Sequence, residues 1–503
     1  MQLRVSRQSR TPIHILDNDS LLHIFYLCRP SVIYGEFGNL WWESCDERWW
    51  YKFAQVCRRW RYLILESASY LGLCLLCTSG TPVADMLAHS PPFPLIIDHV
   101  HENHNLTTED EEGIILALQQ RDHIYCICFR LPIPSLQKLI TAIDGEFPML
   151  PVEYLYIGPP TKHETRLILP RAFEAPHLRH LWLDHFPSQI RSLLLTTATG
   201  LVTVVLRWIH PSTYLDPFNL LQPLSLLTQL ETLEIGFRSP VPKREIEEHL
   251  FHAPIMTHFA LSNLRLFVFW GTSTYLEELL PQMITPFLET FTVHFFNQLS
   301  FSVPRLLQFM TTTERFQFGS ARFVFHHGAV AVFMYTHVGY WLNTFYIDVT
   351  CKHLDWQVSS VAQIFNTLNP LFSEVVDLTL DYREHTSSSE WHNQVDCTRW
   401  HELLGSFRNV KTLRIQDGLV GELSCSLRMD EELTLGLLPG LRELVCPAGS
   451  VNDKTFAAFI HERGVLGKPV NLIRETFPID PIRYTFVSSN GVSFIEPAPV
   501  PPQ

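Results

Sequence analysis

The sequence has no apolar run that would cross a membrane. A spanning helix needs about 20 predominantly apolar residues, and the uncharged segment LLLTTATGLVTVVL (193–206) is shorter than that. The longer segment 323–347 is interrupted by three histidines, two glycines and an asparagine, and polar groups are rare inside lipid. The basic N-terminus is not followed by an apolar run before Asp17. We therefore expect neither a membrane span nor a secretory signal.

Motifs that mark common enzymes are also missing. We find no phosphate-binding glycine loop, no G-x-S-x-G elbow and no metalloprotease helix. Cys74 and Cys77 form one C-x-x-C pair without a second pair at zinc spacing, inside an apolar stretch that favours a buried strand. His99, His101 and His104 cluster as HVHENH, where a surface loop is favoured over a metal site. We expect no catalytic residues, no metal and no cofactor.

Positive charge is scarce. The chain of 503 residues has 38 Lys and Arg against 51 Asp and Glu, a formal net charge of −13, which disfavours a general nucleic-acid binder. The 46% apolar and 18% charged shares are typical of a globular protein with room for more than one domain. The 11 cysteines are odd in number. Without an export signal, we expect reduced thiols in the cytoplasm or nucleus.

A short apolar pattern recurs from Ile124 onward. An apolar residue is followed by two variable residues, an apolar residue, one variable residue and an apolar residue. The last three apolar positions alternate, as a half-buried strand requires. Eleven copies are too many for chance, at residues 124–129, 152–157, 178–183, 201–206, 230–235, 264–269, 288–293, 342–347, 375–380, 410–415 and 441–446.

Helical patterns lie between several of these strands. Apolar residues at Val361, Ile364, Phe365 and Leu368, and at Trp400, Leu403, Leu404 and Phe407, have the spacing of one helix face. Ser359 or Ser360 is a possible N-cap for the first of these helices, and Asn369-Pro370 ends it. The acidic run Glu109 to Glu112, after Thr107 and Thr108, predicts the first turn of another helix.

The strand pattern resembles that of the leucine-rich repeat, L-x-x-L-x-L. The Asn or Cys that usually follows the strand is mostly absent, and the spacing varies from 23 residues (178 to 201) to 35 (375 to 410). The resemblance implies an α/β fold: an irregular solenoid over residues 76–485, with helices on its convex side. A doubly wound α/β domain is the alternative, since it also alternates helices and strands. Residues 486–503 form a Pro-rich tail, extended or disordered.

The N-terminal part has a different pattern. In WWYKFAQVCRRWRYLIL (49–65) the apolar residues recur every three or four positions, which predicts an amphipathic helix or two short helices. Upstream, Asp17 or Asp19 can cap a helix that starts near Ser20. We predict a small helical domain at residues 11–75, after a disordered basic arm at 1–10.

This helical domain resembles an F-box. The block Val56-Cys57-Arg58-Arg59-Trp60-Arg61 matches the second half of the family pattern, and ILDNDSLLHIF (15–25) matches the first half, with Asp17 in place of Pro and Ser20 in place of an apolar residue. The resemblance implies a clip that docks on a Skp-type adaptor, and through it on a cullin–RING ubiquitin ligase. The implied adaptor-binding residues are Leu16, Leu21, Leu22, Ile24, Phe25, Phe53, Val56, Cys57, Trp60 and Leu63.

Several further expectations follow. Trp49, Trp50 and Trp60 are expected at a surface that a partner buries, with packing inside the chain as the alternative. Lys52, Arg58, Arg59 and Arg61 are expected to be solvated.

The repeats are expected to bind an unknown target protein, through side chains that alternate with the buried strand residues. These are His180, Trp182, Asp184, Glu234, Trp270, His294, Thr379, Asp381, Arg414 and Gln416. The chain would thus be a substrate receptor for ubiquitin-dependent protein degradation. A repeat scaffold outside the ubiquitin system, with the helices as a cap, is the alternative.

Overall fold

The computed structural model describes most of the chain. It describes residues 16–29, 49–100, 106–144, 152–158, 175–185, 193–209, 216–238, 258–298, 300–313, 315–336, 345–383, 395–427, 437–447, 455–475, 486–488 and 491–493. The predicted basic arm (1–10), His101, His104 and residues 494–503 of the predicted tail lie outside these ranges. The chain forms two compact units, Met1–Phe296 (unit 1) and Asn297–Gln503 (unit 2).

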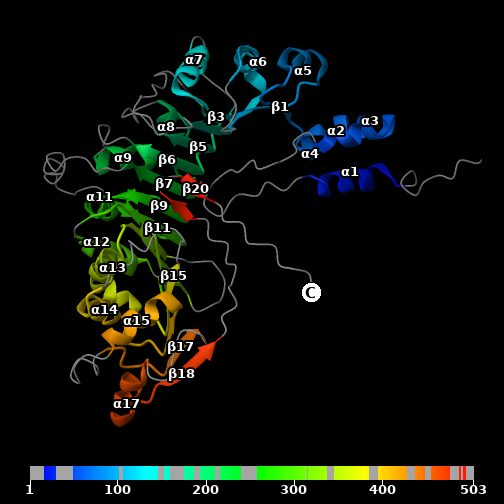
Figure 1. Cartoon of the computed structure of the whole chain (residues 1–503). Helices are drawn as coiled ribbons and strands as arrows, with labels where there is room; N and C mark the ends of the chain where they lie inside the picture. The colour runs from blue at the N-terminus through cyan, green and yellow to red at the C-terminus, as the bar shows by residue number, and fades with distance from the viewer. Residues whose placement is uncertain are drawn as a thin grey trace, which may run out of the picture. The chain divides into compact units, whose positions relative to one another are not determined.

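In its described residues, unit 1 begins with four helices and continues as alternating strands and helices (Figure 1). The first four helices, called the N-terminal helices below, are α1 (Asn18–Leu27), α2 (Trp49–Ala54), α3 (Arg58–Glu66) and α4 (Ala68–Leu71). The later helices are α5 (Val83–His89), α6 (Thr108–Leu118), α7 (Ile133–Asp144), α8 (Leu193–Thr197), α9 (Pro217–Leu224) and α11 (Ser273–Leu279). The main strands are β1 (Leu75–Cys77), β2 (Leu95–His99), β3 (Ile124–Arg130), β4 (Tyr154–Gly158), β5 (His180–Asp184), β6 (Thr203–Ile209), β7 (Thr232–Phe237), β9 (Leu266–Gly271) and β11 (Thr290–Phe295). Two-residue strands β8 (Phe259–Ala260) and β10 (Met283–Ile284) pair separately.

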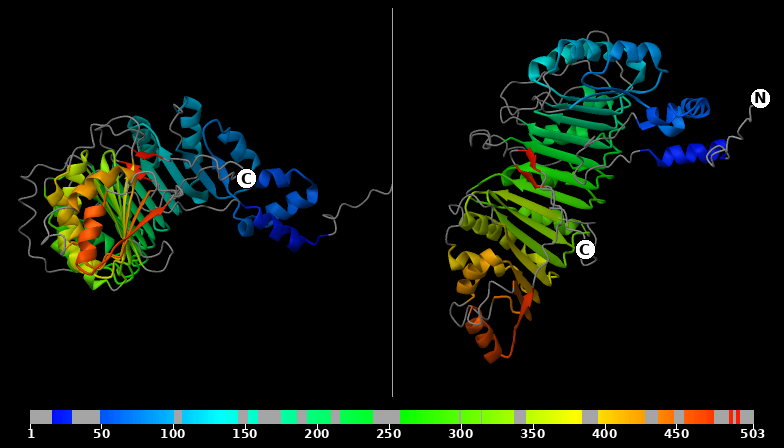
Figure 2. Two further views of the ribbon diagram at one scale, coloured as in Figure 1. Left: turned by 60° about the horizontal axis from the view of Figure 1, so that its bottom comes forward. Right: turned by 45° about the vertical axis from the view of Figure 1, so that its right-hand side comes forward.

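The strands of unit 1 lie side by side in the order of the chain. The sheet runs β1-β2-β3-β4-β5-β6-β7-β9-β11, and every pairing in it is parallel. Figure 2 shows these strands, blue to green, as one ladder. A doubly wound domain reverses its strand order at a switch point, so this order excludes the alternative for unit 1. It is the order expected of stacked repeats.

The seven strands that the apolar pattern predicted in unit 1 are confirmed. The pattern residues are buried because every second side chain of a strand points to the same side of the sheet. Leu155, Leu181, Val204 and Leu233, for example, are at equivalent positions on four successive strands, and all are buried. Helix α6 is confirmed as well. The Thr107 hydroxyl accepts a hydrogen bond from the Asp110 N–H at 3.0 Å, and the Asp110 carboxylate accepts one from the Thr107 N–H at 3.2 Å, which is a capping box.

Strands β1 and β2 were not part of the predicted repeat series. Cys77 is buried in β1, as the apolar stretch around it indicated, and burial raises the pKa of its thiol to about 12. His99 was expected in a surface loop, and that expectation is wrong, because His99 ends β2 and is buried. The ten cysteines in the described ranges are all free thiols.

Unit 2 contains a mostly parallel set of strands with one antiparallel insertion. Its helices are α12 (Pro304–Thr312), α13 (Leu354–Leu368), α14 (Cys397–Leu404), α15 (Asp417–Ser426) and α17 (Ala457–Val465). Its strands are β12 (Ser320–His326), β13 (Ala329–Tyr335), β14 (Phe345–Thr350), β15 (Asp377–Arg383), β16 (Thr412–Ile415), β17 (Glu443–Pro447) and β18 (Asn471–Glu475), with a separate hairpin of β19 (Phe486–Ser488) and β20 (Gly491–Ser493). The sheet order is β14-β13-β12-β15-β16-β17-β18. Four of the predicted strands are confirmed here, whereas the hairpin β12–β13 was not foreseen.

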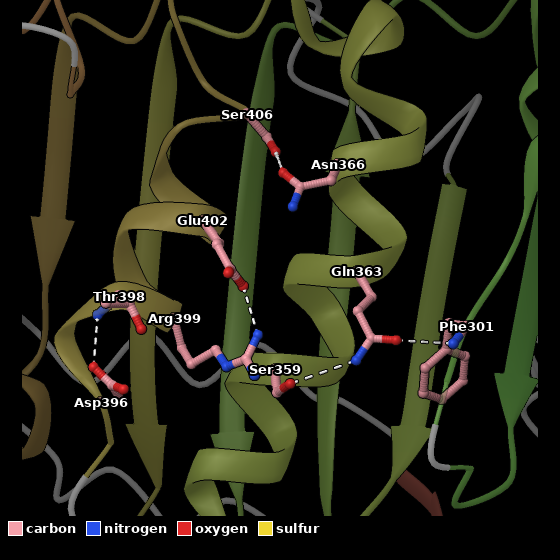
Figure 3. Close-up of polar contacts among 9 residues, drawn as sticks. All are labelled: Phe301, Ser359, Gln363, Asn366, Asp396, Thr398, Arg399, Glu402 and Ser406. Atoms are coloured by element: carbon pink, nitrogen blue, oxygen red, sulfur yellow. Dashed lines mark hydrogen bonds and ion pairs between the residues drawn. The ribbon is translucent and has the colours of Figure 1, made fainter.

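Helix α13 shows how the repeats of unit 2 are joined. It begins at Leu354 after His353, so the expected N-caps Ser359 and Ser360 lie inside the helix instead. Its Gln363 side chain accepts a hydrogen bond from the Phe301 N–H at 3.0 Å, and Asn366 accepts one from the Ser406 hydroxyl at 3.0 Å (Figure 3). Such side-chain bonds connect the helix to segments on both sides of it.

The N-terminal helices include the capped first helix and the two short helices, α2 and α3, that the sequence predicted, whereas α4 was not foreseen. Asp17 caps α1 by accepting a hydrogen bond from the Ser20 N–H at 2.6 Å, and this bond lowers the pKa of the Asp17 carboxyl. Arg59 donates to the Leu16 carbonyl at 2.6 Å and to the Asn18 side chain, and Arg61 donates to the Ala54 carbonyl. Lys52, Arg58 and Arg61 are exposed, as expected, whereas Arg59 is partly buried, so the expectation of plain solvation is wrong for Arg59.

Candidate functional site

The core of the N-terminal helices is aromatic. Phe25 of α1 is fully buried, with its ring 5.0 Å from that of Trp60 in α3 and 5.5 Å from that of Phe53 in α2. Cys57 caps α3, since its sulfur accepts a hydrogen bond from the Trp60 N–H. The sequence folds this way because the apolar positions of α1 and α3 recur every three or four residues, and one stripe of each helix can be buried.

The ten residues implied as adaptor-binding divide into three groups by exposure. Leu21, Phe25 and Leu63 are buried in the core; Leu16, Leu22, Phe53, Cys57 and Trp60 are partly buried; Ile24 and Val56 are exposed. A buried side chain supports the shape of a docking surface, whereas an exposed one can touch a partner directly. Ile24 and Val56, at 39% and 60% exposure, are therefore the direct candidates.

Four further apolar side chains on these helices were missed by the sequence reasoning. Tyr26, Leu27, Tyr62 and Tyr70 are exposed, and the rings of Tyr26 and Tyr70 are 5.4 Å apart. Six of the thirteen exposed large hydrophobic side chains of the described residues thus fall between Ile24 and Tyr70. Concentrated exposed apolar surface marks an interaction site more often than single scattered residues do. The signal in the sequence was that α1 has apolar residues around most of its circumference.

The tryptophans were expected at this surface, and for two of them the expectation is wrong. Trp49 and Trp50 are 8% and 4% exposed. The Trp50 ring lies 5.7 Å from the Phe93 ring just before β2, and the Trp49 ring lies 5.8 Å from that of Phe53. Large aromatics contribute strongly to cores as well as to interfaces, and here the core takes them. Trp60 is partly buried.

A second candidate surface is the set of side chains on the opposite side of the strands from the buried pattern residues, called the polar face below. In unit 1 the register places Tyr156 beside Trp182 and Asp184 beside Arg207 on neighbouring strands. Trp270 and His294 are likewise at equivalent positions, and their rings stack 3.5 Å apart. The expected residues of unit 1 do share this face. They are more enclosed than expected, since Trp182, Glu234 and His294 are buried.

A chain of polar contacts crosses four strands of the polar face. The Tyr156 hydroxyl donates to Asp184 at 3.0 Å, and Arg207 donates to both carboxylate oxygens of Glu234 at 2.5 and 2.9 Å. Burial raises the pKa of Asp184, against the opposing effects of the Arg207 charge and the Tyr156 hydrogen bond. Gly158 leaves room for this arrangement, because a Cβ there would lie 2.8 Å from the Asp184 Cβ.

Next to this chain, His180 gives unit 1 a pH-dependent contact. Its ring stacks on Tyr154 at 4.4 Å, its Nδ1 lies 3.1 Å from the Thr203 hydroxyl, and burial lowers its pKa to about 4. The folded state therefore favours neutral His180. Stability is complete above the unfolded pKa of about 6.5 and is lost as pH falls toward 4, by up to about 3 kcal/mol. We expect His180→Asn to flatten the acid dependence of unfolding of unit 1 in hydrogen exchange between pH 7 and 4.

A matched control is the exposed His461, which lies in unit 2. His461→Asn should leave the acid dependence of unit 1 unchanged. An acid dependence that is the same in His180→Asn and in the wild type would contradict the assignment.

In unit 2 the expected residues again share one face, but one of them is not accessible. Asp381 is buried and forms an ion pair with Arg322 on the neighbouring strand β12. Thr379, Arg414 and Gln416 are partly buried. Charge reversal at Asp381 would place two like charges in a buried site, so it would report on folding and not on target binding. Arg414 is the better choice for a binding test.

No group of three or more His, Cys, Asp or Glu side chains that could hold a metal ion occurs in the described part of the chain. Nor is any helix within the described ranges long and apolar enough to span a membrane. The arrangement offers two surfaces for contact, one on the N-terminal helices and one on the polar face.

Comparisons with known proteins add little to this picture. No protein-family model and no curated protein matches the sequence. Among solved structures, the chain is similar to the leucine-rich repeat-containing protein LegL7 from Legionella pneumophila, with 11% identity over 72% of this chain and 95% of that one, at a TM-score of 0.25. A TM-score of this size supports no conclusion, so the fold class rests on the sheets and helices themselves: α/β, with mostly parallel strands.

Proposed function

We propose that this protein is the substrate-recognition subunit of a cullin–RING (SCF-type) ubiquitin ligase. The observation that carries the proposal is the cluster of exposed apolar side chains on the N-terminal helices. One of these side chains, Val56, belongs to the block Val56 to Arg61 that resembles an F-box. A partner that buried this cluster would remove its contact with water, which is the main driving force of association.

In this proposal the two surfaces have separate roles. The N-terminal helices bind a Skp-type adaptor, with Ile24 and Val56 in direct contact and Phe25 and Trp60 holding the helices together. The repeats bind a target protein through the polar face. The chain carries out no chemistry itself, and it raises the rate of ubiquitin transfer by holding the target near the ligase, which is a proximity effect.

A single surface substitution tests the adaptor contact. Val56→Asp places a charge in the proposed contact without disturbing the core, since Val56 is 60% exposed. We expect the wild type to capture a co-expressed Skp-type adaptor in a pull-down, and Val56→Asp to lose at least about tenfold of it, which corresponds to about 1.4 kcal/mol. Leu27→Asp should weaken capture in the same direction.

Matched controls come from the exposed apolar residues elsewhere in the chain. Val465→Asp makes the same change at 73% exposure in α17, and Leu226→Asp does so for leucine at an exposed position after α9. Both should retain the adaptor. Equal losses in Val56→Asp and Val465→Asp would show a general effect of charge and would contradict the proposed contact.

One observation favours a second candidate, a repeat scaffold outside the ubiquitin system. The burial of Trp50 against Phe93 joins the N-terminal helices to the start of the sheet, as a capping element would. A cap and an adaptor clip can be separated by Val56→Asp. If the helices act only as a cap, neither the wild type nor Val56→Asp should capture the adaptor.

A further inference from the structure

One side chain joins the two segments that resemble the halves of an F-box. Arg59 belongs to α3, and its guanidinium reaches the start of α1. Its Nη2 donates to the Leu16 carbonyl at 2.6 Å, and its Nε and Nη2 donate to the Asn18 side-chain oxygen at 3.1 and 2.9 Å. These hydrogen bonds, called the Arg59 clamp below, connect residues that are 41 and 43 positions apart in the chain.

The clamp acts on a residue that lies outside the helices. Leu16 precedes α1, whose N-cap is Asp17, and its side chain is partly exposed. It is also one of the residues that the F-box resemblance implies as adaptor-binding. A backbone outside a helix has more freedom in φ and ψ, and ordering it when a partner binds costs conformational entropy. Arg59 orders the backbone of Leu16 in advance, because it holds the carbonyl.

The other contacts of α1 lie farther along the helix. Phe25 packs in the aromatic core, and the neighbouring Tyr26 contacts the ring of Tyr70. In an α-helix, the distance from Asp17 to Phe25 corresponds to about 12 Å along the axis. A helix held only at these contacts would be free to turn about them, and its first turn would move farthest. Arg59 prevents this movement because it acts at the first turn.

The clamp lies beside a departure from the F-box pattern. The pattern has a proline where this chain has Asp17. A proline fixes its own φ at about −65° and keeps the residue before it extended, so it would restrict Leu16 through the covalent chain. Asp17 has a φ of −68°, but no ring holds it there. In this chain the hydrogen bonds of Arg59 restrict Leu16 instead.

We propose that Arg59 is a positioning residue of the adaptor contact: it holds Leu16 and the first turn of α1 against α3, in the arrangement that the adaptor binds. This inference rests on the proposed function for the identity of the partner. Asn18 is exposed, so water competes for its hydrogen bonds, and the stability of the N-terminal helices comes mainly from their aromatic core. Loss of Arg59 should therefore weaken adaptor binding more than it lowers stability.

Three variants of the full-length chain test this role by titration with a Skp-type adaptor. Arg59→Met removes the hydrogen-bond donors and keeps a long, unbranched side chain, and it should weaken binding at least about tenfold. Arg59→Lys keeps the charge but lacks the planar fork that reaches two acceptors, so it should lose about as much. Arg58→Met removes an exposed charge one residue away and should bind as the wild type does. Equal losses in Arg58→Met and Arg59→Met, or wild-type binding by Arg59→Lys, would overturn the proposal, because charge would then be the cause.

Substitutions at position 17 separate positioning from a direct contact of Arg59 with the adaptor. Asp17→Pro fits the observed φ and restricts Leu16 without any hydrogen bond, whereas Asp17→Ala does not restrict it; both remove the cap. Combined with Arg59→Met, Asp17→Pro should bind about two- to fivefold more tightly than Asp17→Ala, which is the size of a proline effect at a compatible site. With Arg59 present, the two should bind almost equally. The same ratio in both backgrounds would overturn the proposal.

Hydrogen exchange of the free full-length chain tests the clamp without the adaptor. Arg59→Met should speed exchange at Ser20 and Leu21, whose N–H groups donate to Asp17, and should leave Cys28 at the other end of α1 unchanged. Unchanged exchange at Ser20 and Leu21 would overturn the clamp even if the adaptor binds. A folded wild type that binds no adaptor would instead overturn the proposed function, and with it the adaptor role of Arg59, so the two failures are distinguishable.

Discussion

Replacing Glu234 by alanine should reduce the stability of unit 1 by about 3 to 5 kcal/mol. Glu234 is buried, and Arg207 donates two hydrogen bonds to it from the neighbouring strand. Without Glu234 the guanidinium of Arg207 remains mostly desolvated, and it loses the carboxylate that accepts its two hydrogen bonds. Local hydrogen exchange of β6 and β7 should rise accordingly, because these are the strands that the pair connects.

An exposed pair of the same kind gives the matched control. Arg399 donates to Glu402 at 2.9 Å on α14, with both side chains in solvent (Figure 3). Glu402→Ala should cost less than about 1 kcal/mol. A similar loss of stability in the two variants would contradict the importance assigned to burial. Glu234→Gln should fall between wild type and Glu234→Ala, since it retains a hydrogen-bond acceptor without the charge.

Replacing Phe25 by alanine should release helix α1. Phe25 is fully buried between Phe53 and Trp60, and Phe→Ala in a core costs about 3 to 5 kcal/mol. Exchange of the α1 amides should become faster by about two to three and a half orders of magnitude, since about 1.4 kcal/mol is a factor of ten. If the N-terminal helices bind an adaptor, this variant should also lose it.

Tyr26→Ala is the neighbouring control, because Tyr26 is exposed on the same helix. It should leave the exchange of α1 almost unchanged. Faster exchange throughout the β3–β11 sheet of unit 1 in Phe25→Ala would contradict the view that the aromatic cluster stabilises the N-terminal helices locally.

The strands could be predicted from the sequence because apolar residues recur in them with a two-residue period. In β4, for instance, Leu155 and Ile157 are buried and Tyr156 between them is partly exposed. The hairpin β12–β13 was missed because β13 is apolar at successive positions. Val330, Val332 and Met334 of β13 are buried, and so are Ala329 and Ala331 between them, so the strand has no alternation to detect. A near-continuous apolar run does not distinguish strand from helix by period alone.

The candidate sites were predicted less completely than the fold. The helix period shows which residues share one face of a helix. It does not show which face packs against the protein's own core. Trp50 and Val56 illustrate this: Trp50 is buried against Phe93, whereas Val56 is exposed. In unit 1 the alternation grouped Asp184 with Glu234, yet it could not show that Arg207 pairs with Glu234, nor that Arg322 pairs with Asp381 in unit 2. Pairing across strands depends on register, which only the folded sheet provides.

The most direct test of the proposed function is the mass of the complex formed with a Skp-type adaptor. The full-length chain is co-expressed with the adaptor, and the product is measured by size-exclusion chromatography with light scattering. We expect a one-to-one complex that is lost in Val56→Asp and retained in Val465→Asp. A folded wild-type chain that elutes without the adaptor at micromolar concentrations would contradict the ligase-receptor function and leave the repeat scaffold as the better account.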